Sequence, residues 1–200
     1  CAPPPDAGLG HPRPHERPQV GASAQKEPLQ EHKRHAIRLA TFNARTLRGE
    51  ARRLQLLATA ATLDLHVLAV QEVRDTTLLD HAVHGYTVWS AAADATGHAG
   101  VALFVSTAVR VLSVKCVVPA RVLSLKCVLR ATTFTVTTVY MPPRGSVAQR
   151  AVVDAVVDHV RPDGHPHILL GDFNGARDVF TRSPFIAPHR VCCAPPSDSG

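Results

Sequence analysis

The stretch His167-Ile168-Leu169-Leu170-Gly171-Asp172-Phe173-Asn174 decides the fold of this 200-residue chain. Its first half is a largely apolar run, which is typical of a buried strand, and a carboxylate and an amide follow where that run ends. Because Asp172 and Asn174 are two positions apart, their side chains point to the same side of an extended chain. We expect a fixed polar pair at a strand end, although many Asp/Asn pairs only form turns.

Three earlier segments also carry a polar residue where an apolar run ends. Residues 36–42 lead to Asn43, residues 65–70 lead to Glu72, and residues 134–139 lead to Tyr140. We read all three runs as strands. If the strands are adjacent, their polar ends and the Asp172/Asn174 pair meet at one rim of a sheet.

A helix is predicted between the first two strands. It follows Gly49 and Glu50, and apolar residues recur at i, i+3, i+4 and i+7. The expected buried stripe is Leu54, Leu57, Ala58 and Ala61. Strand, helix and strand within about 35 residues predict a βαβ unit.

The rest of the globular part is predicted to contain several further strands and a second helix. Strands are expected at 86–89 and 100–105, with a turn at 94–97. The sequence Arg-Val-Leu-Ser-Val-Lys-Cys-Val at 110–117 returns as Arg-Val-Leu-Ser-Leu-Lys-Cys-Val at 121–128, and one such repeat predicts a strand meander rather than a solenoid. A helix follows Ser146 as its N-cap and stops near Pro162 and Gly164.

Composition indicates one domain with irregular ends. Residues 1–35 hold seven of the 16 prolines and no aromatic residue, so we expect them to be disordered. We assign 36–180 to the domain and 181–200 to an irregular tail. Lys and Arg exceed Asp and Glu by 22 to 16, and an excess of +5 falls on 36–200. A modest basic balance suits a polyanionic partner such as nucleic acid, and equally an ordinary protein.

The cysteines and the apolar runs bear on location. The five cysteines contain no C-x-x-C pair, which favours a reducing compartment. No apolar run approaches the roughly 20 residues that span a bilayer, and the start lacks the apolar core of a signal peptide. We expect an intracellular protein, with the nucleus as one candidate location.

The polar strand ends suit phosphate chemistry. Mg²⁺ prefers oxygen ligands, usually one or two carboxylates with waters and phosphate oxygens. Glu72 supplies such a carboxylate, and Asn43 supplies a neutral oxygen or a hydrogen bond that positions it. Asp172 can orient and deprotonate an attacking water, while Asn174 and Tyr140 can donate hydrogen bonds to a phosphate.

This set resembles the endonuclease/exonuclease/phosphatase superfamily, which includes apurinic endonucleases and the endonuclease domains of LINE-type retroelements. Five stretches carry the resemblance, in order: Leu39–Leu47, Val67–Arg74, Gly97–Ala102, Val139–Pro143 and Ile168–Gly175. The resemblance implies an α/β fold, a four-layer α/β/β/α sandwich. It also implies Mg²⁺, or Mn²⁺ in its place, bound by Glu72 with support from Asn43. Asp172 and Asn174 would then handle the water and the phosphate, and Tyr140 would contact the phosphate.

The form Asn43-Ala44-Arg45-Thr46-Leu47 is more similar to retroelement endonucleases than to bacterial or vertebrate repair enzymes. The resemblance therefore implies DNA as the substrate and, in a longer parent chain, a downstream reverse transcriptase domain. Arg45 can touch a phosphate, or it can be a solvated surface residue. The arginines of 45–53 likewise form either a DNA-facing stripe or only a solvated helix start.

The sequence departs from the family pattern near its end. Family members carry a Ser-Asp-His element far downstream, whose His acts on the scissile phosphate, and we expect this element to be missing here. Ser197-Asp198-Ser199 lies only 26 positions past Asp172 and is more similar to an Asn-Asp-Asn-Gly stretch of retroelement sequences. We expect an incomplete second sheet and a weakly active or inactive chain, because loss of a general acid/base costs about 10²–10⁴ in rate. Two alternatives stay open: a phosphoesterase acting on a phosphoinositide or another small phosphoester, and an inactive remnant that binds nucleic acid.

His165 and His167 form an H-x-H pair that can suggest zinc. No further ligand follows at metal spacing, so we interpret the pair as a partly exposed entrance to a strand. Cys116 and Cys127 are expected to be small core or edge residues, since nothing nearby in the sequence offers an activating base.

Overall fold

The computed structural model describes residues 36–76, 84–160, 164–176 and 191–193. The chain divides into two units, Cys1–Ala36 and Ile37–Gly200, and every element below belongs to the second. The expected disorder of residues 1–35 lies outside the described residues. The helices are α2 (Glu50–Thr62) and α3 (Val147–His159), and the strands are β1 (Leu39–Asn43), β2 (Val67–Gln71), β3 (Tyr86–Ala91), β4 (Val101–Ser106), β5 (Arg110–Val118), β6 (Val122–Leu129), β7 (Thr132–Tyr140), β8 (His167–Asp172) and β9 (Val191–Cys193).

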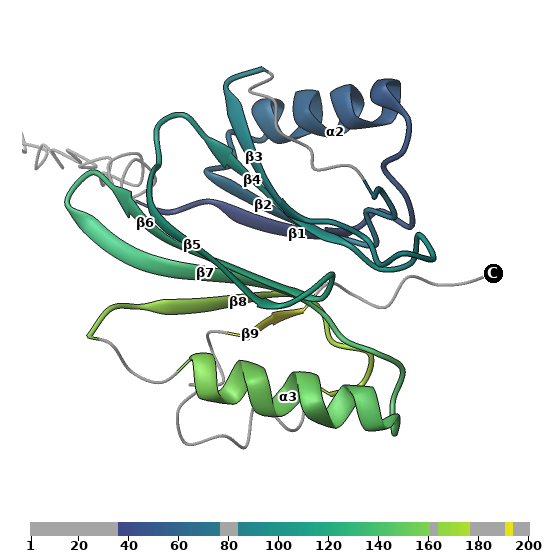
Figure 1. Ribbon diagram of the computed structural model, residues 1–200. Coiled ribbons are helices and arrows are strands. Elements are labelled where there is room, and N and C mark those ends of the chain that lie inside the picture. The colour runs from purple at the N-terminus through teal and green to yellow at the C-terminus, as the bar shows by residue number, and fades with distance from the viewer. Residues whose placement is uncertain (1–35, 77–83, 161–163, 177–190, 194–200) are drawn as a thin grey trace, which may run out of the picture. The chain divides into compact units, whose positions relative to one another are not determined.

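Two sheets pack face to face in the unit Ile37–Gly200 (Figure 1). One sheet has the order β1-β2-β4-β3, and the other has the order β5-β6-β7-β8-β9. Helix α2 covers the outer face of the first sheet, and α3 covers part of the outer face of the second (Figure 1). The predicted α/β/β/α sandwich is therefore confirmed. The described strands of the first sheet all precede those of the second along the chain.

The strand directions place four strand ends at one rim. Strands β1 and β2 are parallel and joined by α2, as the predicted βαβ unit requires. Strands β7 and β8 are also parallel, with α3 between them. Parallel strands finish at the same edge of a sheet, so each sheet brings two carboxyl ends together.

The core between the sheets is apolar and draws on both of them. Val67 and Leu103 from the first sheet pack in one cluster with Leu125 and Phe134 from the second. Each is at most 1% exposed, and full burial of such a side chain stabilises the fold by about 1.5–3 kcal/mol. All five residues of β2 are buried, as the sequence predicts for a strand covered on both faces.

The predicted buried stripe of α2 is wrong in part. Leu57 is buried as expected, but Ala60 is its buried partner, whereas Ala58 and Ala61 are exposed. Apolar residues occur on more than one side of this Ala- and Leu-rich helix, so spacing alone leaves the face ambiguous. Packing of the larger Leu56 and Leu57 side chains decides which face of α2 is buried. Leaving an alanine methyl exposed loses little hydrophobic stabilisation.

Helix α3 agrees with the sequence. The Ser146 hydroxyl accepts a hydrogen bond from the Gln149 backbone N–H over 3.1 Å, which is the predicted N-cap. Its apolar face packs on the outer face of the second sheet. The residues in this contact are Val152, Val153 and Val156 of α3 with Val122, Val139 and Leu169 of the sheet.

The expected irregular tail does not hold at Val191–Cys193. These residues form β9, which pairs in parallel with β8 at the edge of the second sheet. Three residues are too few to show a hydrophobic period, so the sequence gives no signal for this strand. Residues 181–190 and 194–200 lie outside the described residues. Within the described part of the chain, neither helix is long and apolar enough to cross a bilayer.

Candidate active site

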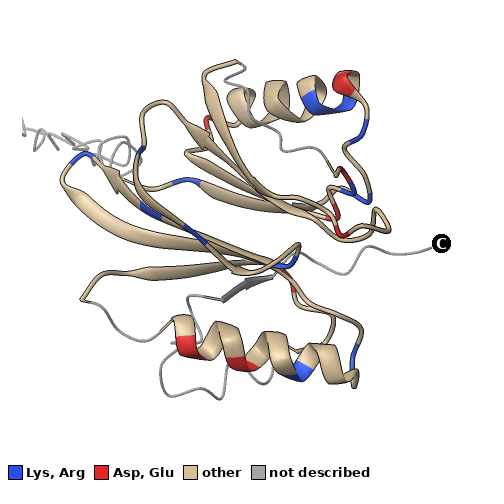
Figure 2. Ribbon diagram, in the orientation of Figure 1, with Lys and Arg blue, Asp and Glu red and all other residues tan. Residues whose placement is uncertain are grey.

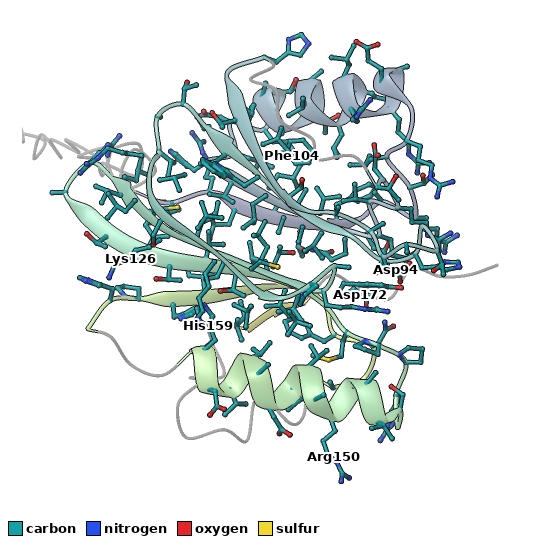
Figure 3. All side chains as sticks on the ribbon, viewed as in Figure 1. Asp94, Phe104, Lys126, Arg150, His159 and Asp172 are labelled. Carbon is teal, nitrogen blue, oxygen red and sulfur yellow. The ribbon has the colours of Figure 1, made fainter. Side chains whose placement is uncertain are left out.

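The structure brings the predicted residues together at one rim. Asn43 ends β1 and pairs in register with Gln71, directly before Glu72. Tyr140 ends β7 and pairs in register with Asp172 at the end of β8. Figure 3 labels Asp172 where the two sheets face each other.

The side-chain amide of Asn43 joins the two carboxylates. Its Nδ2 donates to Glu72 Oε1 and to Asp172 Oδ2, each over 2.8 Å. The two carboxylate oxygens therefore lie within twice that distance of each other, although the residues belong to different sheets. Asn43 Oδ1 accepts from the Arg45 backbone N–H over 3.0 Å, which fixes the orientation of the amide.

Glu72 is held as a carboxylate by several donors. Its side chain is 12% exposed, and Arg74 donates to Oε2 over 2.5 Å. Burial by itself raises the pKa of Glu72, but hydrogen bonds from Asn43, Arg74 and Tyr140 and the charge of Arg74 outweigh burial and lower that pKa. Glu72 is thus ionised at neutral pH and available to a cation.

Tyr140 remains a hydrogen-bond donor. Burial, the charge of Glu72 and a hydrogen bond to Glu72 raise the pKa of Tyr140. The guanidinium of Arg121 lies 4.9 Å from the centre of the Tyr140 ring, a cation–π contact that braces the ring. A phenol has one proton, so its hydrogen bond to Glu72 and a hydrogen bond donated to a phosphate exclude each other.

Asp172 and Asn174 lie in a tight turn at the end of β8, rather than on one side of an extended chain as the sequence predicted. The Asn174 backbone N–H donates to Asp172 Oδ1 over 3.1 Å. Asn174 Nδ2 donates to the Met141 carbonyl over 2.6 Å, so one N–H of this amide braces the loop after β7. At Gly171, where φ is +155°, an added Cβ would collide with the Val139 carbonyl oxygen. Only glycine allows β8 to approach β7 this closely just before Asp172.

Four of the nine described non-glycine residues with positive φ lie at or next to the site. Glu72, Arg74 and Arg45 have φ of 53°, 52° and 55°, and Asn174 has φ of 41°. Residues other than glycine rarely adopt this left-handed conformation, which costs about 1–3 kcal/mol when the surroundings impose it. Such strain commonly marks functional positions.

A buried polar contact beneath the rim links the sheets. Gln71 is fully buried; it accepts from Thr41 Oγ1 over 3.1 Å and donates to Thr138 Oγ1 over 2.9 Å. Gln71 and Arg74 were not predicted as site residues. Their position beside Glu72 in the sequence is the only signal that could have found them.

The arginines of 45–53 divide into two groups. Arg48 donates to the carbonyls of Arg74 and Gly97, and Arg53 pairs with Asp75 over 3.5 Å. These two arginines hold loops of the protein itself. Arg45 and Arg52 are exposed. Figure 2 shows basic and acidic residues interleaved in the loops that follow β1 and β2.

The donor set fits a hard divalent cation. Among the described residues, no three His, Cys, Asp or Glu side chains are grouped as ready ligands. Mg²⁺ does not require such a cage, because it commonly binds one or two carboxylates and completes its shell with waters and phosphate oxygens. The neighbouring Glu72 and Asp172 carboxylates meet that requirement.

Comparisons with solved structures agree with this fold. An AP endonuclease from Archaeoglobus fulgidus superposes with a TM-score of 0.56 at 18% identity, covering 80% of this chain and 66% of that one. The endonuclease domain of TRAS1, a telomere-specific non-LTR retrotransposon, gives 0.52 at 18% identity, covering 67% and 58%. A mannosyl-6-phosphatase from Bacteroides thetaiotaomicron gives 0.51 at 16% identity, covering 70% and 66%.

The chain thus spans less than two thirds of the length of each of these three proteins. No curated protein sequence matches the chain. The sequence model of the Endonuclease/Exonuclease/phosphatase family matches residues 40–193, which include every site residue predicted from the sequence. The chain therefore belongs to the endonuclease/exonuclease/phosphatase family.

Proposed function

We propose that the chain is a Mg²⁺-dependent phosphodiester hydrolase, the endonuclease domain of a retroelement, with DNA as its substrate. The observation that carries this proposal is the Asn43 amide, which donates to Glu72 and Asp172 at once. Two carboxylates held this close repel each other unless a donor or a cation lies between them. The arrangement suits a site that alternates between the bridged state and a cation-bound state.

Glu72, oriented by Asn43, would hold the metal ion. When bound, Mg²⁺, or Mn²⁺ in its place, would neutralise charge that builds up on a phosphate. Arg74 already neutralises part of the Glu72 charge, and its side chain is 42% exposed. Arg74 can therefore swing towards solvent, or towards a substrate phosphate, without leaving a buried charge behind.

Asp172 would orient the attacking water and accept its proton. The backbone N–H of Asn174 and the Asn43 amide fix the Asp172 carboxylate in one orientation. Asn174 Nδ2 uses one N–H on Met141, and its second N–H would donate to the phosphate. In its present position Tyr140 orients Glu72, and its hydroxyl would reach a phosphate only after leaving that carboxylate.

DNA is favoured as the substrate by charge. The chain carries a net charge of +6, and Arg45 is exposed two residues from Asn43. The likeness to the TRAS1 domain agrees with the retroelement form of the Asn43–Leu47 stretch. A reverse transcriptase domain encoded downstream remains part of this proposal.

Divalent-ion binding tests the site separately from turnover. In NMR spectra we expect Mn²⁺ to broaden the backbone amides next to Glu72 and Asp172. In Glu72→Gln and in Asp172→Asn, the Mn²⁺ concentration needed for the same broadening should rise at least about 10-fold, since each change removes an anionic group beside the cation. Asp154→Asn is the matched control, because Asp154 is an exposed carboxylate on α3. Equal broadening in Glu72→Gln and in the unaltered protein would contradict the proposed metal site.

Turnover tests the substrate. Nicking of supercoiled plasmid should require Mg²⁺, stop with EDTA and fall at least about 10²-fold in Asp172→Asn. Parallel assays with bis(p-nitrophenyl) phosphate and p-nitrophenyl phosphate separate diesters from monoesters. Faster hydrolysis of the monoester than of plasmid would favour a small phosphoester. Salt-dependent DNA binding without cleavage would favour a nucleic-acid-binding remnant.

A further inference from the structure

The sequence repeat places two Ser-x-Lys segments side by side in the β5–β6 hairpin, outside the active site. Ser113-Val114-Lys115 of β5 and Ser124-Leu125-Lys126 of β6 lie side by side in the antiparallel hairpin. The register pairs Ser113 with Lys126 and Lys115 with Ser124. The two Ser-x-Lys copies thus run head to tail on one face of the sheet, with a lysine at each diagonal corner.

Two further strands extend this polar row. Lys126 pairs in register with Thr135 of β7, which pairs in turn with His167 of β8. This is the outer face, because Leu125 and Val136, the intervening residues, point into the core between the sheets. Helix α3 covers the other half of the outer face with its valines and ends here at His159.

These side chains line a hollow of about 190 Å³. Its described lining residues are Ser113, Lys115, Ser124, Lys126, Thr135, His159 and His167. All seven are polar or basic, and none is Asp or Glu. The volume is below the roughly 300 Å³ at which pockets for drug-sized ligands begin, so it suits one small group.

Three side chains at and beneath the hollow are connected by hydrogen bonds. The Thr137 hydroxyl donates to Ser124 Oγ over 2.8 Å and lies 2.8 Å from His167 Nε2. These two contacts join Ser124, Thr137 and His167 in one hydrogen-bonded row. The rings of His159 and His167 meet edge to face with their centres 5.4 Å apart, which holds both rings at the edge of the hollow.

Charge selects an anion for this hollow. Two lysines, three hydroxyl groups and two imidazoles line the hollow, and none of these described lining residues carries a carboxylate. The C-terminus of α3 carries a partial charge of about −0.5 at this corner, which two full positive charges exceed. A divalent cation is disfavoured, since the lysines would repel it.

The hollow lies away from the active site. Figure 3 shows Lys126 and His159 at one end of the second sheet and Asp172 at the other. His167 begins β8 and Asp172 ends it, five residues later, which is roughly 17 Å along a strand. A ligand here therefore does not touch the carboxylate pair.

We propose that this hollow binds a phosphate oxyanion, held by Lys115 and Lys126 and by the hydroxyls of Ser124 and Thr135. The phosphate belongs either to the backbone of a nucleic acid or to a small phosphorylated compound. Its chemistry is the same in both cases: tetrahedral oxygens that accept charge-assisted hydrogen bonds from lysine and hydroxyl donors. The proposal does not depend on hydrolysis at the active site.

A titration of the full chain with inorganic phosphate tests the site. ¹H–¹⁵N NMR spectra recorded during the titration provide the readout. We expect saturable shifts of the amides of 113–115 and 124–126. In Lys115→Ala/Lys126→Ala the phosphate concentration at half-saturation should rise at least about 10-fold, since two charge-assisted hydrogen bonds are lost. Lys115→Arg/Lys126→Arg should retain binding. Equal shifts in the alanine variant, or equal shifts with sodium chloride at matched ionic strength, overturn the proposal.

Two controls separate this site from the rest of the protein. Arg150→Ala removes one positive charge from α3 on a side chain that points away from the hollow (Figure 3) and should leave phosphate binding unchanged. Asp172→Asn should also leave the shifts at 113–115 and 124–126 unchanged, so a failed active-site proposal does not affect this result. Loss of the shifts in Asp172→Asn would assign the bound phosphate to the active site and overturn the proposal.

Duplex DNA identifies the source of the phosphate. With a fluorescent 20-base-pair duplex, loss of two phosphate contacts should reduce the slope of log affinity against log salt by about 1.8 in the alanine variant. That outcome supports a nucleic-acid backbone. An unchanged slope together with weakened binding of inorganic phosphate supports a small phosphorylated compound.

Discussion

Gln71 of β2 donates a hydrogen bond of 2.9 Å to Thr138 of β7 and so connects the two sheets directly below the carboxylate pair. Both side chains are fully buried. The next residue after Gln71 is Glu72, and Asp172 ends β8, the strand next to β7. The spacing of the two carboxylates therefore depends on how the sheets are fixed to each other at this contact.

Replacing Gln71 alone should be costly. Gln71→Leu leaves the Thr138 hydroxyl buried without its donor, and we expect the free energy of unfolding to fall by about 1–3 kcal/mol. Urea unfolding followed by circular dichroism measures this. The double variant Gln71→Leu/Thr138→Val removes both partners and should recover part of the loss. If the single variant is as stable as the unaltered protein, the contact does not hold the sheets.

Asn43 should act as the spacer between two like charges. Asn43→Asp places a third carboxylate between Glu72 and Asp172, so it should destabilise the protein more at pH 8 than at pH 5. Added Mg²⁺ should restore more stability to Asn43→Asp than to Asn43→Ala, because only the former adds an anionic ligand. Thermal unfolding with and without Mg²⁺ measures both effects. Identical Mg²⁺ responses in the two variants would argue against a shared site.

Gly171 should tolerate no side chain. Gly171→Ala places a Cβ against the Val139 carbonyl at a φ of +155°, so the expected loss is at least about 3 kcal/mol from overpacking and backbone strain together. Gly145→Ala is the matched control. Its φ is +80° and nothing lies within 4 Å of an added Cβ, so only the backbone term of about 1 kcal/mol remains. Similar losses in both variants, measured by urea unfolding, would show that β7 and β8 can separate.

The lowered pKa of Glu72 predicts an acid-sensitive contribution to stability. Folding favours the ionised form, so this contribution is fully present above the unfolded pKa of about 4.3 and is lost as the pH falls through the lower folded value. The stability difference between the unaltered protein and Glu72→Gln should therefore shrink between about pH 5 and pH 3. Arg74→Ala removes one of the partners that lower the pKa and should make this pH dependence shallower. A difference that stays constant over this range would contradict the assignment.

Strand ends were the most predictable part of the molecule. Asn43 and Tyr140 directly follow a run read as a strand, and a single residue separates Glu72 and Asp172 from theirs, so period and position place all four before any contact is known. Parallel strands bring these ends together within each sheet, and the packing of the two sheets then brings Glu72 and Asp172 to one rim. The hydrogen bonds from Asn43 confirm that the Glu72 and Asp172 carboxylates are neighbours.

Features set by tertiary packing could not be predicted in the same way. The buried face of α2 depends on which leucines fit against β1 and β2, and β9 exists only because β8 offers it an edge. The role of Gln71 could not be predicted, because nothing in the sequence shows that Thr138 faces it across the core. Likewise, the Ser-x-Lys repeat predicted strands, whereas only their register shows that the two copies surround one hollow.

The two sheets come from separate, consecutive parts of the chain, so the carboxylate pair forms only when both parts are assembled. Every described strand of the first sheet ends by Ser106, and every described strand of the second starts at or after Arg110. A chain cut within 107–109 would yield two fragments, one with Glu72 and the other with Asp172. Neither fragment holds both carboxylates, so divalent-ion binding regained on mixing would report fragment complementation directly.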